Sequence, residues 1–366
     1  VLPDVNNYPP FRNLIINGDM SIDQRNGGAS QTIASANTYY IDRFLAREVT
    51  DGALTIDQDT TSPDDFTHSM KITTTTADAS LSSTQRAYVV QKIEGYNISK
   101  LAFGTSSAKT ITISFYVRSS LTGTFSGSIL NEGENRSYVF EYTINSADTW
   151  ERKTITIAGD TSGTWNTDNT VGMLIYFSMG MGSTYSGSAG AWSGNQLFAS
   201  TGSTNLVSTL NATWFMTGLQ IEQGDSATPF EFLPFDMNLK RCQRYCVVYN
   251  NDGDFQSALL FTGASRGSSH KFFYIPLPQV MRDIPSITLS GEIRIINIKQ
   301  GNSVDADDTI TVGGVTPVIQ GLTKFHKGLT IFFNGSMSTI TDTANTGYVM
   351  MFHRETGNKL TFDGEL

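Results

Sequence analysis

Two tryptophans and one tyrosine lie where the surrounding sequence offers them no apolar neighbours. Trp165 lies in the polar run T-S-G-T-W-N-T-D-N, and Tyr185 and Trp192 lie in a segment rich in glycine and serine at residues 179–211. A flat aromatic ring can hold the C–H face of a sugar, while Asn, Asp, Gln or Arg bind the hydroxyls at its rim. We therefore predict Trp165, Tyr185 and Trp192 as glycan-binding residues. The alternative is that this long segment folds over a neighbouring subunit.

No pattern of residues typical of an enzyme stands out. The four histidines are scattered, and the sequence has neither H-E-x-x-H nor G-x-x-x-x-G-K. A glycosidase needs two carboxylates across the scissile bond, and the candidates all lie in polar stretches where solvated loop charges are the ordinary explanation. These candidates are Asp64, Asp65, Glu132, Glu134, Asp305, Asp307 and Asp308. We therefore expect a protein that is not an enzyme and has no catalytic residues.

Composition favours short strands joined by turns. The chain has 366 residues, of which 39% are hydrophobic, 11% aromatic and 16% charged, with a formal net charge of −9. The length predicts two or three domains, and the acidic balance argues against nucleic acid as a partner. No apolar run approaches 18 residues, so we expect no membrane insertion, and the first residues do not resemble a signal peptide.

Only two cysteines occur, Cys242 and Cys246. Their spacing puts them on one face of a helix, which suits two buried thiols better than a disulfide. A metal site would need further ligands, and no histidine lies nearby. The low cysteine count is typical of a protein made in a reducing cytosol.

Two β domains are expected, with a break around residues 214–246. A strand pattern at 214–221 is followed by turn residues, and then by a helix capped by Asp236 that we expect to run from about 237 to 249. We predict an all-β fold: a jelly-roll sandwich at 13–232, a linker with a short helix at 233–246, and a C-terminal β-sandwich at 247–366. Strands of the first domain are expected at 14–16, 39–46, 53–57, 69–74, 87–93, 110–118, 123–131, 138–144, 150–157, 172–178 and 214–221.

A series of short motifs, taken in order, resembles phage tail-fibre and related virion proteins. The motifs are N-L-I-I-N-G-D-M at 13–20, D-R-F at 42–44, L-Q-I-E-Q-G at 219–224, A-T-P-F-E at 227–231, L-K-R-C-Q-R-Y at 239–245, M-R-D-I-P at 281–285 and D-G-E-L at 363–366. The resemblance implies a jelly roll like a carbohydrate-binding module, followed by a small C-terminal β domain. It also implies a non-enzymatic tail fibre or receptor-binding protein that adheres to a glycan on the host surface.

Two other functions stay open at this point. The same fold without a ligand would serve a capsid decoration or tail adaptor protein with a structural role. A tail-spike polysaccharide depolymerase is the third reading, because sequence cannot place carboxylates across a cleft or a subunit interface.

The resemblance also bears on metals. No cofactor is required, but such jelly rolls often hold a structural calcium near the opening motif. Asp19 is the candidate ligand, although Ser21 stands where the family has Glu. The run from Asp305 to Asp308 resembles a calcium loop only loosely, and a solvated turn is the ordinary explanation.

The expected partners follow from the same resemblance. Homotrimers are common among such proteins, and the consecutive aromatics at 272–274 and 332–333 suggest strands buried on both faces between subunits. Residues 1–12 hold three prolines and are expected to form an extended arm that attaches to other virion or tail proteins. The other partner would be a bacterial surface polysaccharide. The protein would be located in the virion and assembled in the cytoplasm of the host bacterium.

Overall fold

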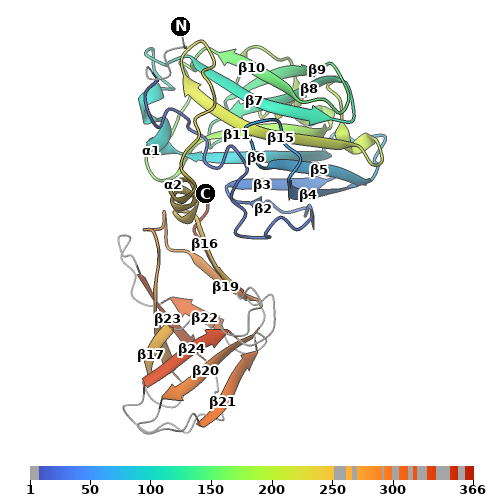
Figure 1. Cartoon of the computed structure of the whole chain (residues 1–366). Coiled ribbons are helices and arrows are strands. Elements are labelled where there is room, and N and C mark those ends of the chain that lie inside the picture. The colour runs from blue at the N-terminus through green and yellow to red at the C-terminus, as the bar shows by residue number, and fades with distance from the viewer. Residues whose placement is uncertain are drawn as a thin grey trace. The chain divides into compact units, whose positions relative to one another are not determined.

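The computed structural model describes residues 8–250, 261–265, 270–290, 292–298, 305–311, 316–319, 328–334, 347–352 and 359–366. Two compact units divide the chain: the first extends to Leu239 and includes Leu366, and the second spans Lys240–Glu365 (Figure 1). Each unit is built from antiparallel sheets, so the expected all-β class is confirmed. The division between Leu239 and Lys240 falls within the segment expected to be a linker.

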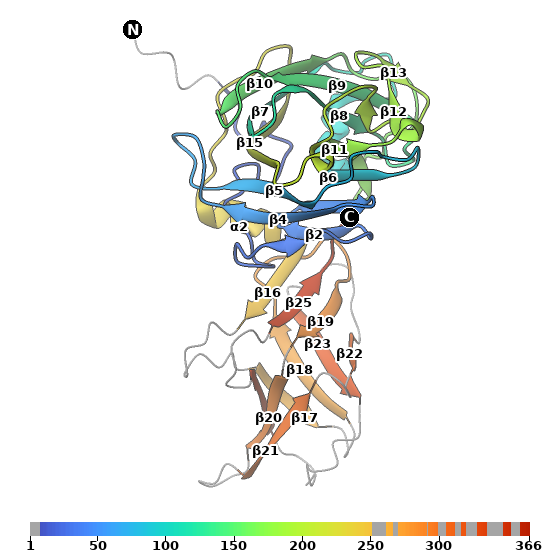
Figure 2. The ribbon, with the colours of Figure 1, turned by 90° about the vertical axis from the view of Figure 1, so that its right-hand side faces the viewer.

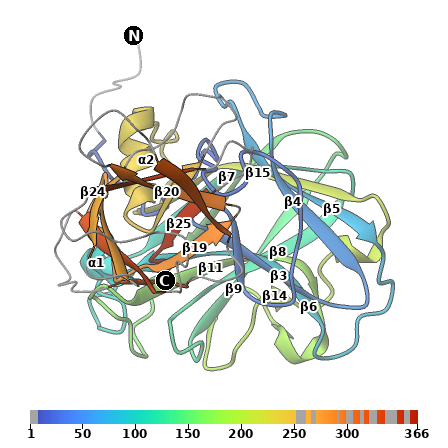
Figure 3. The ribbon, with the colours of Figure 1, turned by 90° about the horizontal axis from the view of Figure 1, so that it is seen from below.

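Unit 1 is a sandwich of two sheets. Sheet A has the strand order β1-β4-β5-β15-β7-β10. Its strands are β1 (Gln31–Thr32), β4 (Ala53–Asp59), β5 (Ser69–Thr76), β15 (Thr213–Gln223), β7 (Ile111–Ser119) and β10 (Glu151–Ile157). The closing strand β15 lies between β5 and β7 (Figure 3). Most of the L-Q-I-E-Q-G motif at 219–224 belongs to this strand, near the middle of the sheet.

Sheet B has the order β13-β9-β8-β11-β6-β3-β2. Its strands are β13 (Trp192–Ser193), β9 (Ser137–Ile144), β8 (Gly123–Leu130), β11 (Val171–Met181), β6 (Arg86–Glu94), β3 (Phe44–Val49) and β2 (Thr38–Ile41). The expected single strand at 39–46 is two strands, β2 and β3, because Arg43 turns the chain between them with φ +72°. The short helix α1 (Gly95–Ile98) follows β6.

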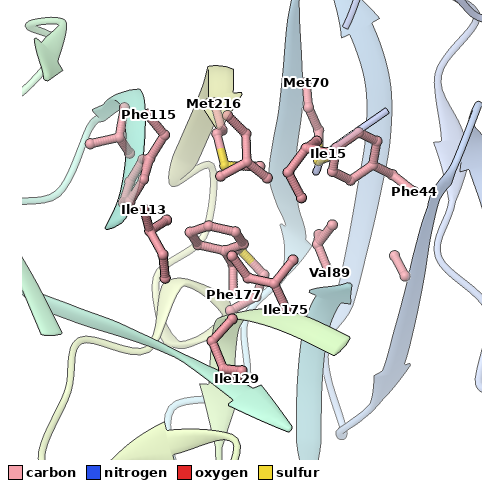
Figure 4. Packing of buried hydrophobic residues seen from close by; sticks show 14 of the residues in the cluster. Ile15, Phe44, Met70, Val89, Ile113, Phe115, Ile129, Ile175, Phe177 and Met216 are labelled. Atoms are coloured by element: carbon pink, nitrogen blue, oxygen red, sulfur yellow. The ribbon is translucent and has the colours of Figure 1, made fainter. Parts of the chain in front are cut away.

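The core of unit 1 lies between the facing sides of the two sheets. Figure 4 shows Ile113, Phe115 and Met216 from sheet A beside Ile175 and Phe177 from sheet B. Trp214 in the closing strand β15 is fully buried, and its Nε1 donates to Tyr142 Oη at 3.2 Å. Alternation on β7 puts Ile111, Ile113, Phe115 and Val117 inward, which is the period of a strand with one face in the core.

The opening motif forms no strand, contrary to expectation. Leu14 N donates to Ile221 O at 2.9 Å, while Asn13 Oδ1 accepts from the backbone N of both Ile15 and Ile221. Gln91 from β6 bonds the backbone of Ile16 through both ends of its amide. The segment is therefore held by side-chain amides together with the backbone bond to Ile221, and not by a strand ladder.

The A-T-P-F-E motif binds the first described residues of unit 1, and we call this contact the clamp. Glu231 accepts the backbone N–H of Phe11 at 2.6 Å and of Asn13 at 2.9 Å. Arg12 Nε donates to Thr228 Oγ1 at 2.8 Å. Residues 11 and 12 are therefore bonded into unit 1 and do not form a free arm. Residues 1–7 of the expected arm lie outside the described residues.

The expected linker helix is present but shorter. Helix α2 spans Phe235–Gln243, and the next residues form strand β16 (Cys246–Asn250). The helix ends before residue 249 because the run from Cys246 to Tyr249 is apolar and β-branched and pairs with β25 (Lys359–Asp363). Cys242 and Cys246 are two buried thiols, as predicted.

Unit 2 contains two antiparallel sheets. The smaller has the order β16-β25-β19, with β19 at Ser286–Ser290. The larger has the order β21-β20-β24-β17-β18-β23-β22. Its strands are β21 (Asp305–Thr311), β20 (Glu292–Ile298), β24 (Gly347–Phe352), β17 (Phe261–Ser265), β18 (His270–Pro276), β23 (Gly328–Asn334) and β22 (Thr316–Ile319). Asp305, Asp307 and Asp308 therefore lie in a strand, and the expected solvated turn was wrong.

Candidate functional site

The outer face of sheet B carries a group of tyrosines that we call the tyrosine face: Tyr39 on β2, Tyr88 on β6, Tyr176 on β11, and Tyr185 on the turn η2 (Ser183–Tyr185). Tyr88 and Tyr176 point outward because their neighbours Val89, Ile175 and Phe177 point into the core. Leu45, Val90 and Leu174 share this face. Sheet B is thus apolar on both sides.

Residues 182–205 form a segment that we call the cover: its Tyr185, Phe198 and Ala199 pack on the tyrosine face, while its strand β13 extends the edge of sheet B. Figure 2 shows the short strands β12 (Ser186–Gly187) and β13 of this segment near β8, β9 and β11. The cover is bonded to the body: Gly182 N donates to Gln85 O at 2.8 Å, and Ser200 N donates to Ser126 Oγ at 3.0 Å. This explains why a long Gly/Ser-rich segment is ordered.

Phe198 makes the main apolar contact between the cover and the tyrosine face. Its side chain is 2% exposed, and its ring centroid lies 4.6 Å from that of Tyr176, 5.4 Å from Tyr185 and 5.6 Å from Tyr88. Phe198 N donates to Tyr185 O at 2.9 Å. The contact leaves Tyr88 and Tyr176 buried and Tyr185 half-buried at the border of the cover.

Polar groups surround these rings. The Cζ atom of Arg86 lies 4.5 Å from the ring centroid of Tyr185. Tyr88 Oη donates to Asn37 Oδ1 at 3.1 Å, and Arg47 Nε donates to Ser35 O at 2.8 Å. Arg47 and Tyr88 are directly opposite in the β3–β6 register. Aromatic carbon and hydrogen-bonding groups therefore adjoin, which is what a saccharide requires.

Glu134 is the carboxylate of this surface. Its Oε1 accepts from Tyr176 Oη at 2.8 Å, and its Oε2 accepts from Gln196 of the cover. Burial, with the nearby Glu134 charge, holds the pKa of the Tyr176 phenol well above its ordinary value, and burial also raises the pKa of Tyr88. Both phenols therefore remain neutral hydrogen-bond donors at ordinary pH.

The structure does not bring the three predicted residues to one place. Tyr185 lies at the tyrosine face, whereas Trp165 and Trp192 pack on the core side of sheet B, with ring centroids 5.6 Å apart. Trp165 is 7% exposed against Phe103, which argues against direct sugar contact by its ring. Trp192 is half-buried beside Tyr138, and its Nε1 donates to Ala158 O at 2.8 Å. Glycan contact by Trp192 stays a prediction.

Tyr39, Tyr88 and Tyr176 were not singled out from the sequence. Each lies in a strand pattern, where an aromatic residue is ordinarily core. One signal was available in the sequence. In the run A-Y-V-V-Q-K-I at 87–93, apolar residues occupy both faces of the expected strand. A strand of this kind needs a cover on each side.

Asp19, the candidate calcium ligand, is engaged by an amide. Asn238 Nδ2 donates to Asp19 Oδ1 at 3.0 Å and to Ser21 Oγ at 3.1 Å. Within the part of the chain that the structure describes, no three His, Cys, Asp or Glu side chains are grouped so as to hold a metal ion. A structural calcium stays a prediction.

Residues 263–267 read G-A-S-R-G, the spacing of a nucleophile elbow. An elbow needs a strand, a sharp turn and a helix, with the serine on the turn. Ser265 instead ends strand β17, and the chain returns as the antiparallel strand β18. This spacing therefore lacks the structural context of a hydrolase.

Two further expectations concern partners. The backbones of Phe272 and Phe332 are opposite in the β18–β23 register, but their side chains, on which the subunit-packing prediction depends, lie outside the described residues. Among the helices described, none is long and apolar enough to cross a membrane.

No family model and no curated protein matches the chain. Among solved structures, the enzymatically active domain of bacteriophage CBA120 tailspike protein 4 is similar at 12% identity and TM-score 0.32, covering 59% of this chain and 22% of that one. A family 11 carbohydrate-binding module of Clostridium thermocellum, solved with a mixed-linked tetrasaccharide, is similar at 14% identity and TM-score 0.27, covering 56% and 98%. A CBM4 structure is similar at 17% identity and TM-score 0.28, covering 57% and 98%. Each is a likeness in β architecture.

Proposed function

We propose that this protein is a non-enzymatic adhesin that binds a glycan at the border of the tyrosine face. The observation that carries the proposal is the half-buried ring of Tyr185, with Arg86 against it and Phe198 beneath it. The exposed edge of this ring would contact the C–H groups of a pyranose, because Arg86 lies over one of its faces. The hydroxyls of the sugar then meet the side chains of Asn37, Arg47 and Glu134 nearby.

The biological setting that fits this site is the virion of a tailed phage, as a tail fibre or receptor-binding protein attached to the host surface. The order of short motifs in the sequence supports it. A homotrimer would present three sites, and linking weak sites raises avidity by roughly 10²–10⁴. Residues 1–7 would attach the protein to other virion proteins, and assembly would take place in the host cytoplasm.

Binding of the labelled full chain to an array of bacterial surface polysaccharides tests the proposal. We expect Tyr185→Ala to abolish binding and Tyr185→Phe to retain most of it, because the ring and not the hydroxyl makes the contact. The matched control is Tyr96→Ala, since Tyr96 is 59% exposed and lies on helix α1. Equal binding by Tyr185→Ala and the wild type would contradict the proposed site.

Two further measurements separate the alternatives. Release of new reducing ends from a bound polysaccharide would show a depolymerase. Failure to bind any polysaccharide, with antibody labelling on the capsid or within the tail, would instead favour a decoration or adaptor protein. We expect neither result, but binding without cleavage and labelling at the tail tip.

A further inference from the structure

We propose that the glycan bound at the tyrosine face is anionic, and that Arg47 and Arg86 bind its carboxylate or phosphate. This inference rests on the proposed function and names the ligand class. It begins from the placement of two like charges. In the β3–β6 register Arg47 is opposite Tyr88 and Val49 is opposite Arg86, so the two arginines are diagonal neighbours on the outer face of sheet B.

The two guanidinium groups lack the compensation that other cations of unit 1 have. Arg12, Lys71, Arg118, Arg136 and Lys153 each have a carboxylate oxygen between 2.5 and 3.5 Å away. Neither Arg47 nor Arg86 forms an ion pair with any residue that the structure describes. Like charges on adjacent strands destabilise a sheet, and a bound anion offsets this repulsion because it attracts both guanidinium groups.

Arg86 is the better placed of the two. Its Nε is buried without a hydrogen-bond partner among the described residues, and its Cζ lies 4.5 Å from the centroid of the Tyr185 ring. The ring holds the guanidinium in place while its remaining N–H groups stay available. A planar guanidinium binds carboxylate or phosphate oxygens in pairs, which a lysine cannot do.

The acidic groups nearby do not replace the ligand. Glu48 follows Arg47 in the sequence but lies on the opposite side of β3, where it accepts the backbone N–H of Thr50. Glu134 is bonded to Tyr176 and Gln196. The chain as a whole has a formal net charge of −9, which repels anions in general. Two neighbouring arginines therefore provide a local positive site that selects an anion.

The test compares three polymers on the full chain by affinity electrophoresis: a uronic-acid polysaccharide, the same polymer with its carboxyl groups reduced to alcohols, and a glycerol-phosphate polymer. We expect the wild type to bind at least one anionic polymer about ten- to a hundred-fold more tightly than the reduced one. Arg86→Gln and Arg47→Gln should each remove most of that difference, and added salt should weaken it. Arg152→Gln is the control, since Arg152 lies exposed on β10 in the other sheet.

The outcomes are distinguishable. A preference for the uronate or for the phosphate polymer, lost in Arg86→Gln, supports the proposal and identifies the anionic group. Equal binding of charged and reduced polymers, abolished by Tyr185→Ala and unchanged by the arginine variants, would overturn the anionic ligand while leaving glycan binding intact. Binding of no polymer, on this panel and on the polysaccharide array, would overturn both.

Discussion

The rings of Phe198 and Tyr176 lie with their centroids 4.6 Å apart and their planes tilted by 37°. One ring belongs to the cover and the other to the central strand of sheet B. This contact joins a segment rich in glycine and serine to the outer face of sheet B. Its removal should therefore affect the cover more than the body.

Phe198→Ala should destabilise the cover by about 3–5 kcal/mol, because a fully buried ring is lost without a replacement. Hydrogen exchange should rise in residues 182–205 while the amides of β7 and β15 stay protected. Leu210→Ala is the control, as Leu210 is 55% exposed. Unchanged exchange in the cover would show that its backbone bonds suffice without the ring.

Gly218→Ala should be destabilising by about 2–5 kcal/mol. Gly218 has φ +63°, and an added Cβ would lie 2.7 Å from Phe66 Cζ and 3.0 Å from Tyr116 Cδ2. Backbone strain and overpacking therefore add together. Gly190→Ala isolates the strain, since Gly190 has φ +91° and open space around it. In the Phe66→Ala background the cost of Gly218→Ala should fall towards that of Gly190→Ala, measured by urea unfolding.

Glu231→Gln should loosen the first residues of the body. The carboxylate accepts two backbone N–H groups, from Phe11 and Asn13, and an amide replaces one acceptor with a donor that faces an N–H. We expect a loss of about 1–3 kcal/mol and faster proteolysis ahead of residue 13. Glu132→Gln, exposed in a turn, is the control. Equal proteolysis of both variants would contradict the clamp.

Asp42 should make unit 1 less stable as pH rises from about 4 to 6. Burial raises the pKa of Asp42 from 3.8 to about 6, although Arg25 and the Gln24 hydrogen bonds oppose the shift. The folded state therefore binds the proton more tightly than the unfolded state. The stabilisation is fully present below the unfolded pKa and is lost as pH passes the folded pKa, in total about 3 kcal/mol.

Asp42→Asn removes this titration, so the stability of the variant relative to the wild type should increase over the same pH window. Tryptophan fluorescence in urea measures it for unit 1 alone, because all four tryptophans lie in that unit. A stability difference that is flat between pH 4 and 6 would contradict the shifted pKa.

Regular strands could be predicted from the sequence because their alternation records one buried face. The expected strand at 110–118 is β7 at Ile111–Ser119, and that at 87–93 is β6 at Arg86–Glu94. The opening segment at 14–16 reads as a strand by composition. Two of its partners are distant in sequence, the side-chain amide of Gln91 and the backbone carbonyl of Ile221, and no local pattern reveals them.

The site was only partly predictable. Tyr185 stood out because glycine and serine surround it, and the structure places it at the tyrosine face. Trp165 looked equally isolated, but its neighbour Phe103 comes from 62 positions earlier in the sequence and buries it. Local polarity thus identifies an aromatic without a local partner, and cannot identify one whose partner lies on another part of the chain.

Sheet B ends at β13, which is only two residues long, and sheet A ends at β1, which also has two. Longer free edges would present a row of unpaired N–H and C=O groups on which the strand of another molecule could grow. With such short ends, two of the four sheet borders of unit 1 are poor templates for fibril-like pairing. Copies of this chain can therefore crowd closely together with little risk of aggregation through those two edges.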